Sequence, residues 1–104
     1  MTRKTGNDDE YHLEWLTDTE NAAAFLNAVI EDNDREAFLL ALRDVAQAQG
    51  GMTAIAEKTH VSRSSLYKTL SKRGNPEFSS ISKLLHGMGL RLTVEPEMQV
   101  HAAT

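Results

Sequence analysis

The chain has 104 residues and a net charge of −4, which suits a single domain with a modest core. It contains no cysteine, which excludes a disulfide framework, a thiolate metal site and a cysteine nucleophile. No apolar run approaches the roughly 20 residues of a membrane span, and the polar N-terminus lacks the apolar stretch of a signal peptide. We therefore expect a cytoplasmic protein without a membrane partner, in which dimerisation would add stability to a small core.

The N-terminal half predicts two amphipathic helices. Thr17 followed by Glu20 matches a capping box, which predicts a helix from there to about residue 32. Asp34 can cap a second helix, which ends near Gly50 because glycine readily adopts a left-handed conformation. The apolar residues on one face of this second helix are Phe38, Leu39, Leu42, Val45 and Ala46.

The C-terminal half predicts three shorter helices and one strand. The apolar spacing indicates helices over residues 52–59 and 62–70, and a third helix that Ser79 can cap. Leu90–Val94 alternates apolar and polar residues, which is typical of a strand. Because a single strand leaves its backbone groups unpaired, we expect it to pair with its copy in a second subunit. The predicted fold class is therefore all-α, with about five helices and a short C-terminal β-strand.

The expected organisation is one helical domain between two flexible ends. Residues 1–16 form an N-terminal arm that is partly disordered, because its first positions are polar and show no periodicity. Residues 17–96 form the helical domain with its C-terminal strand, and residues 97–104 form a flexible tail.

Charge is distributed unevenly along the chain. Residues 1–57 carry 12 acidic and 4 basic side chains, a balance of −8. Residues 58–91 carry 7 basic side chains against Glu77 alone, a balance of +6, and residues 92–104 carry −2. A basic block within an acidic chain predicts a local phosphate-binding surface, although a chance excess of basic residues on a solvated surface would give the same counts.

Residues 54–68 have the pattern of a helix-turn-helix. Two helices that cross through a short turn need a small residue on the first helix, here Ala56. Val61 supplies an apolar residue for the turn, Ser62 a cap for the second helix, and Leu66 an anchor one turn later. The positions between these anchors face outward and can form hydrogen bonds: Arg63, Ser64, Tyr67 and Lys68.

At these residues the chain resembles the Xre-type helix-turn-helix family of phage-repressor-like DNA-binding domains. Three segments are more specific: Ser-Arg-Ser-Ser-Leu-Tyr-Lys-Thr-Leu-Ser, Gly-Asn-Pro-Glu-Phe and Gly-Leu-Arg-Leu-Thr-Val. With the helix before Gly50 they are similar to addiction-module antidote proteins, the HigA-like antitoxins of type II toxin–antitoxin pairs. The resemblance covers residues 16–96. It implies a homodimer that binds double-stranded operator DNA, represses its own operon and neutralises a small, basic, RelE-like ribonuclease toxin.

The resemblance also implies roles for individual residues. The positions that match the recognition helix, which faces the major groove, are Arg63, Ser64, Tyr67 and Lys68. An arginine there can bond bidentately to guanine. The residues expected near phosphates are Ser62, Met52, Thr53, Lys72 and Arg73. The family usually has glycine where this chain has His60, a position that needs positive φ, and histidine tolerates positive φ better than most residues.

Other interpretations stay open. A stand-alone phage-type regulator would bind DNA without a toxin, and a protein-interaction module would use its acidic half against a basic partner without binding DNA. For an antitoxin, that acidic half is the expected toxin contact, with Tyr11 and Trp15 as apolar anchors, although these charges would also simply keep a small protein soluble. The predicted strand would also suit pairing with a strand of the toxin in place of its own copy. Arg63 and Lys68 would also suit a solvated helix face, and Tyr67 would also suit packing along its helix.

We expect no enzymatic activity, no metal and no cofactor. The histidines show no ligand spacing: His12, His60, His86 and His101. Ser64 and Ser65 lie beside Lys68 on one exposed helix without an oxyanion hole or an acidic partner, so a serine nucleophile is not expected.

Overall fold

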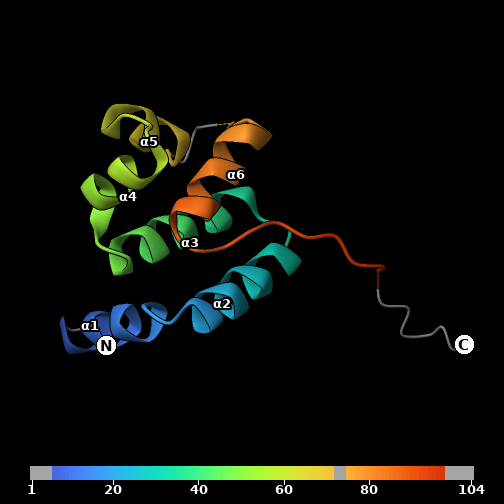
Figure 1. Ribbon diagram of the computed structural model, residues 1–104. Coiled ribbons are helices and arrows are strands. Elements are labelled where there is room, and N and C mark those ends of the chain that lie inside the picture. Colours follow the sequence, from blue (N-terminus) through green and yellow to red (C-terminus); the bar gives the residue numbers. More distant parts are fainter. Residues whose placement is uncertain (1–5, 72–74, 98–104) are drawn as a thin grey trace, which may run out of the picture.

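The computed structural model describes residues 6–71 and 75–97, which contain six helices and no strand (Figure 1). The helices are α1 (Gly6–Leu16), α2 (Thr19–Glu31), α3 (Arg35–Ala48), α4 (Gly51–Thr59), α5 (Arg63–Thr69) and α6 (Phe78–Gly87). The predicted all-α class is confirmed, whereas the predicted count of about five helices is wrong. None of the helices in the described ranges has the length and apolar character that crossing a membrane requires.

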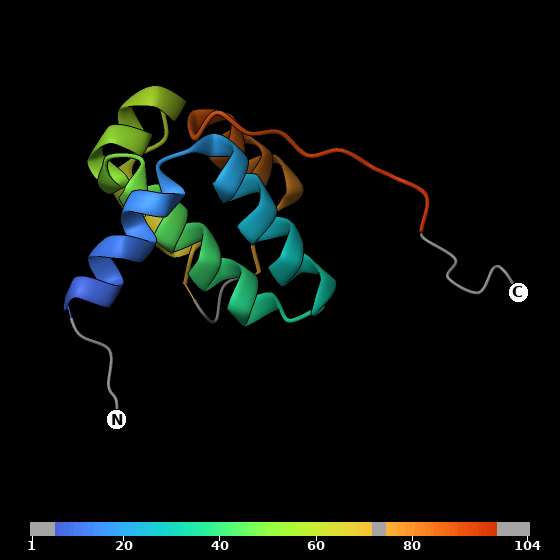
Figure 2. The same cartoon turned by 90° about the horizontal axis from the view of Figure 1, so that it is seen from below.

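Helix α3 lies at the centre of the fold, between α1 and α2 below it and the other three helices above it in Figure 1. It packs against α1, α2 and α4, while α4, α5 and α6 pack against one another. Figure 2 shows the start of α1 extending beyond the rest of the bundle. All six helices contribute to one hydrophobic core, which comprises Leu16, Ala22, Leu26, Leu39, Ala41, Leu42, Val45, Ala46, Ile55, Leu66, Leu70, Leu84, Leu85 and Met88.

Short polar side chains set the starts of α2 and α3. Asp34 accepts a hydrogen bond from the backbone N–H three residues later at 3.1 Å, so the predicted cap of α3 is confirmed. The predicted cap of α2 is wrong by one residue, because Asp18 accepts from the backbone N–H of Glu20 at 2.9 Å. Thr17 faces the other way and donates from Oγ1 to the carbonyl of Glu14 at 2.7 Å, at the end of α1.

Helix α1 is the element that the sequence patterns missed. Its first turn is polar, so no apolar period indicates a helix there. The His12 ring meets Phe25 of α2 edge-on with 5.1 Å between centroids, and His12 Nε2 lies 3.6 Å from Asp44 Oδ2 of α3. Leu16, at the end of α1, is fully buried. Contacts with other helices, rather than its own periodicity, therefore order this segment.

Side chains from neighbouring elements satisfy the last carbonyls of α1, which a helix end leaves without backbone partners. Asn21 Nδ2 donates to the carbonyl of Trp15 at 2.9 Å. Gln49 Nε2 donates to the carbonyls of Leu16 and Thr17 at 3.2 and 3.1 Å. Because Gln49 lies at the end of α3, these bonds fasten the corner between α1 and α2 to the central helix.

The predicted C-terminal strand does not form in the described chain. Leu90 is half-buried on the core, and residues 91–97 are exposed and have neither helical nor strand structure. The N–H of Leu90 donates to the carbonyl of Leu85 at 2.8 Å, which closes α6. An alternating sequence becomes a strand only against a partner, and no element of the described chain lies alongside to supply one.

Candidate nucleic-acid interface

A turn over residues 60–62 joins α4 to α5. His60 has φ 60° and ψ 32°, so the predicted positive φ is confirmed. Its N–H donates to the carbonyl of Ala56 at 2.9 Å, and the N–H of Val61 shares that carbonyl at 3.3 Å. The turn is thus closed against the end of α4, and its direction is fixed by backbone bonds.

Buried side chains hold α5 against α4 and α6. Ile55, Leu66 and Leu70 are at most 3% exposed. Ala56 and Val61 are half-buried and pack against the same core. These positions face inward as the apolar pattern predicts. Since α5 has only seven residues and would not be stable alone, this packing is what keeps it helical.

Helices α4 and α6 approach each other closely at Gly87. A Cβ atom at Gly87 would collide with Cγ2 of Thr59, so the contact requires glycine. Thr59 is itself held in place, because its Oγ1 donates to the carbonyl of Ile55 at 2.8 Å. This contact fixes the position of the α4–α5 pair on α6.

The outward face of α5 is polar and exposed. Arg63, Ser64 and Lys68 are exposed, and the Tyr67 residue keeps 45% of its surface open. The guanidinium carbon of Arg63 lies 5.8 Å from the centroid of the Tyr67 ring, within cation–π range. Tyr67 therefore packs along its helix, as one of the two interpretations expected, and steadies Arg63 at the start of α5.

Ser62 caps α5, which confirms that prediction. Its Oγ accepts a hydrogen bond from the backbone N–H of Ser65 at 3.1 Å. Its hydroxyl also donates to Ser65 Oγ at 3.0 Å. Because both hydroxyl functions are used within the protein, Ser62 acts on this surface by orienting α5.

The other residues expected near phosphates fall into three positions. Thr53 is exposed on the first turn of α4. Met52 is half-buried and packs against the core, so its side chain is structural. Lys72 and Arg73 lie outside the described residues, and their roles stay predictions.

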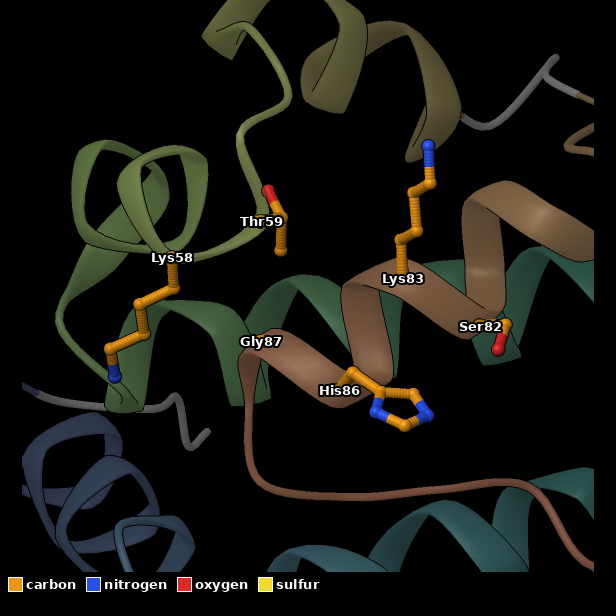
Figure 3. A pocket seen from close by; sticks show the side chains of 6 residues that line it. All are labelled: Lys58, Thr59, Ser82, Lys83, His86 and Gly87. Carbon is orange, nitrogen blue, oxygen red and sulfur yellow. The ribbon is translucent and has the colours of Figure 1, made fainter.

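A hollow of about 320 Å³ between α4 and α6 was not indicated by the sequence patterns (Figure 3). It is lined by Lys58, Thr59, Ser82, Lys83, His86 and Gly87. Figure 3 shows the amino groups of Lys58 and Lys83 and the ring of His86 pointing away from one another. These groups therefore make an open basic surface and do not converge on one small ligand.

A second hollow, of about 200 Å³, separates α5 from α6. Its polar lining consists of hydroxyl groups and one amino group, from Ser65, Thr69, Ser79, Ser80 and Lys83. The prediction that Ser79 caps α6 is wrong, because the helix begins at Phe78 after an extended Glu77. Ser79 and Ser80 instead bring hydroxyls beside α5. Their adjacency in sequence, one turn before Lys83, was the only signal.

The basic side chains on α4–α6 have no acidic partner among the residues that the structure describes. The histidine–carboxylate contact found among the described residues, between His12 and Asp44, joins α1 and α3. Lys58, Arg63, Lys68 and Lys83 are exposed. A surface with unpaired basic groups can attract phosphate without first breaking internal ion pairs. The described residues thus form an all-helical fold with exposed basic side chains on α4, α5 and α6.

Comparison with known proteins identifies the family. The family described as "Probable addiction module antidote protein" matches residues 9–96. An uncharacterized protein of Haemophilus influenzae (strain ATCC 51907 / DSM 11121 / KW20 / Rd) is 37% identical over 82 residues, which cover 79% of this chain and 84% of that protein. No solved structure gives a significant match. The chain belongs to the probable addiction module antidote family.

Proposed function

We propose that this protein is the antitoxin of a type II toxin–antitoxin module and represses its own operon, with α4 and α5 binding operator DNA as a helix-turn-helix. Membership of the antidote family supports the antitoxin role. The observation that carries the DNA-binding role is the exposed, unpaired basic face of α5 on a fixed turn. In such motifs the second helix enters the major groove, with its first residues on base edges.

Arg63 reads a base in this proposal. It stands in the first turn of α5, and its stacking on Tyr67 at 5.8 Å limits the directions that the guanidinium can take. An arginine presented in this way can bond to O6 and N7 of a guanine, the commonest specific contact in the major groove. Lys68 and Ser64 complete the face that meets the groove.

Groups around α5 bind phosphates and set the position of the protein on the duplex. Thr53 lies in the first turn of α4, and the hydroxyl-lined hollow with Ser79 and Lys83 lies between α5 and α6. Lys72 and Arg73 extend this role along the chain between α5 and α6. Such contacts fix register and carry no sequence information of their own.

Two copies of the chain bind the operator together. Helix-turn-helix dimers place their recognition helices about 34–36 Å apart, one turn of DNA, on two half-sites. Two half-sites give a specificity that one short helix does not provide, and dimerisation adds to the buried core of a small chain.

A small, basic, RelE-like toxin binds the acidic half in this proposal. The acidic residues exposed between α1 and the first turn of α3 include Glu10, Glu14, Asp18, Glu31, Asp32 and Glu36. Tyr11 and Trp15 are one helical turn apart on α1, and 76% and 44% of their surfaces are exposed. Opposite charge speeds the encounter of two proteins, and aromatic anchors supply much of the affinity.

DNA binding by Arg63→Ala tests the proposal. On the intergenic DNA upstream of its own gene, the variant should lose about 1–3 kcal/mol of binding free energy and relax its preference at one base pair. Fluorescence anisotropy with this duplex and with a scrambled duplex measures both effects. Arg43→Ala, on an exposed residue of α3, is the matched control and should bind as the wild type does.

The outcomes separate the possible roles. Equal losses on both duplexes would remove Arg63 from base reading and leave it a phosphate contact. Failure of the wild-type protein to bind this DNA would refute the DNA-binding role.

A protein-interaction module without DNA binding is the second candidate. The acidic surface with its exposed aromatic pair on α1 favours it. A wild-type protein that binds a basic partner and leaves the duplex unbound would establish this alternative. A neighbouring short reading frame for a basic protein would separate an antitoxin from a stand-alone regulator. Neither candidate assigns a chemical reaction to the chain.

A further inference from the structure

Residues 90–97 follow α6, and most of their backbone N–H and C=O groups have no hydrogen-bond partner in the described structure. Both views of the fold show this segment running away from the helices (Figures 1 and 2). Residues 91–97 are exposed, including Leu92 at 39% and Val94 at 97%. An extended segment with free N–H and C=O groups is a template for pairing with another chain.

Two observations decide which edge of this segment can pair. In an extended chain the backbone groups of successive residues point to opposite edges. The N–H of Leu90 is already bonded to the carbonyl of Leu85, and Pro96 has no N–H. The even-numbered edge therefore lacks a donor at both ends, whereas the odd-numbered edge keeps all of its donors, on Arg91, Thr93 and Glu95.

We propose that two copies of this protein pair through residues 90–97, antiparallel and in the register centred on Thr93. The facing pairs are then Thr93 with Thr93, Leu92 with Val94 and Arg91 with Glu95, the last two occurring twice by symmetry. Hydroxyl, apolar and opposite-charge pairs each stabilise facing strands. The register also leaves Pro96 on the outer edge, where no N–H is needed.

Neighbouring registers lose part of this complementarity. Centring the pair on Leu92 places Arg91 opposite Thr93, so the opposite-charge pairs disappear. Centring it on Val94 keeps an opposite-charge pair, Arg91 with Glu97, but places Leu92 opposite Pro96, so the apolar pairs of Leu92 with Val94 disappear. The order of charge in the segment, basic before the centre and acidic after it, is complementary to its own antiparallel copy. Because the segment is complementary to its own antiparallel copy, the strand that pairs with it belongs to a second copy of the chain.

The inference rests on the two-copy binding of the proposed function and gives it an interface. The described residues of a single chain form no strand, because the pairing needs both copies. Every test of the pairing is made without DNA, so that it does not depend on operator binding.

Single-cysteine variants report the register, because the chain has no cysteine of its own. In the proposed register the two Thr93 Cα atoms lie about 5.5 Å apart, within disulfide range. Residues in diagonal positions lie about 7–8 Å apart, beyond that range. Mild oxidation should therefore give a covalent dimer with Thr93→Cys and leave the matched controls Leu92→Cys and Val94→Cys uncrosslinked. Crosslinking of either control in place of Thr93→Cys overturns the register, and crosslinking of none overturns the pairing.

A charge exchange tests the same register without a covalent bond. Arg91→Glu sets like charges opposite each other twice and should raise the dimer Kd roughly tenfold. The double variant Arg91→Glu/Glu95→Arg restores opposite charges and should return the Kd to that of the wild type. Sedimentation of these variants measures the Kd, with Arg43→Glu as a control of equal charge change on α3. An unchanged Kd for Arg91→Glu, or no recovery in the double variant, overturns the proposal.

The two proposals fail in different ways. If the wild-type chain is a monomer at every concentration and still binds the upstream DNA, the pairing is overturned and the DNA-binding role stands. If Thr93→Cys forms the covalent dimer and the wild type binds no DNA, the pairing stands and the DNA-binding role is overturned.

Discussion

The two halves of this molecule use their polar side chains differently. In α1–α3, side-chain contacts join different helices. Gln49 donates to the carbonyl of Leu16, and His12 lies beside Asp44. In α4 and α5 the side-chain bonds stay local, as from Thr59 to the carbonyl of Ile55. The basic groups of α4–α6 have no acidic partner in the described structure. Polar groups thus hold the first half together, while the basic groups described on α4–α6 stay available to a ligand.

The largest expected effect tests whether the halves share one core. Leu42 is fully buried in the central helix α3. Leu42→Ala should lower the free energy of unfolding by about 2–5 kcal/mol, because it leaves a cavity. Urea denaturation followed by circular dichroism measures the loss. Leu40→Ala, on a residue of the same helix that is 44% exposed, is the control. Two separate transitions in the wild type would show that the halves unfold independently.

The next effect concerns the contact that positions the basic half. Gly87→Ala drives a methyl group into Thr59 and should cost about 1–3 kcal/mol of stability. Thr59→Ser removes the methyl group that collides and keeps the hydroxyl that donates to Ile55. The double variant should therefore recover most of the loss in urea denaturation. A double variant as unstable as Gly87→Ala would show that the collision with Thr59 is not the cause.

A smaller expected effect, on DNA binding, compares a residue of the basic block at 58–91 with a basic residue of the acidic half. Lys72→Ala should weaken binding to specific and scrambled DNA alike, and flatten the dependence of log K on log salt by about one unit. Arg43→Ala removes the same charge from α3 and should leave that slope unchanged. Anisotropy titrations over a range of salt concentrations measure the slope. Equal slopes for the two variants would show that Lys72 does not bind phosphate any more than Arg43 does.

The smallest expected effect on the free energy of unfolding concerns two non-glycine residues with positive φ, one in each half of the molecule. Asn33 and His60 both have positive φ, 58° and 60°. His60→Gly should raise the unfolding free energy by about 0.5 kcal/mol, since relief of strain exceeds the entropy that glycine adds to the unfolded chain. Asn33→Gly should change it less, because asparagine tolerates this conformation well. Thermal unfolding of both variants gives the comparison, and a larger gain at Asn33 would contradict it.

Much of the helical fold follows from local patterns in the sequence. The apolar period of α3, its cap at Asp34 and the turn at His60 are set by nearby residues, and the structure has them as predicted. Helix α1 could not be predicted in this way, because its order depends on Phe25 and Asp44, which are distant in sequence. The C-terminal strand was predicted from alternation alone, which says nothing about whether a partner strand is present.

The features of the candidate site that local spacing sets were predictable, and those that depend on helix packing were not. The exposed residues of α5 were predictable because helical spacing determines which positions face outward. The stacking of Arg63 on Tyr67 follows from their separation of one helical turn. The hollow with Ser79 and Lys83 was not predictable, since it forms where α6 packs beside α5.

The attachment of α1 gives the molecule an element that can open by itself. Among its described side chains only Leu16 is buried, and the bonds at its end come from residues that belong to other helices. Segments with few buried contacts open at a lower free energy than the global unfolding of a domain. Backbone amides of α1 should therefore exchange with solvent deuterium earlier than those of α3, while the other five described helices stay folded.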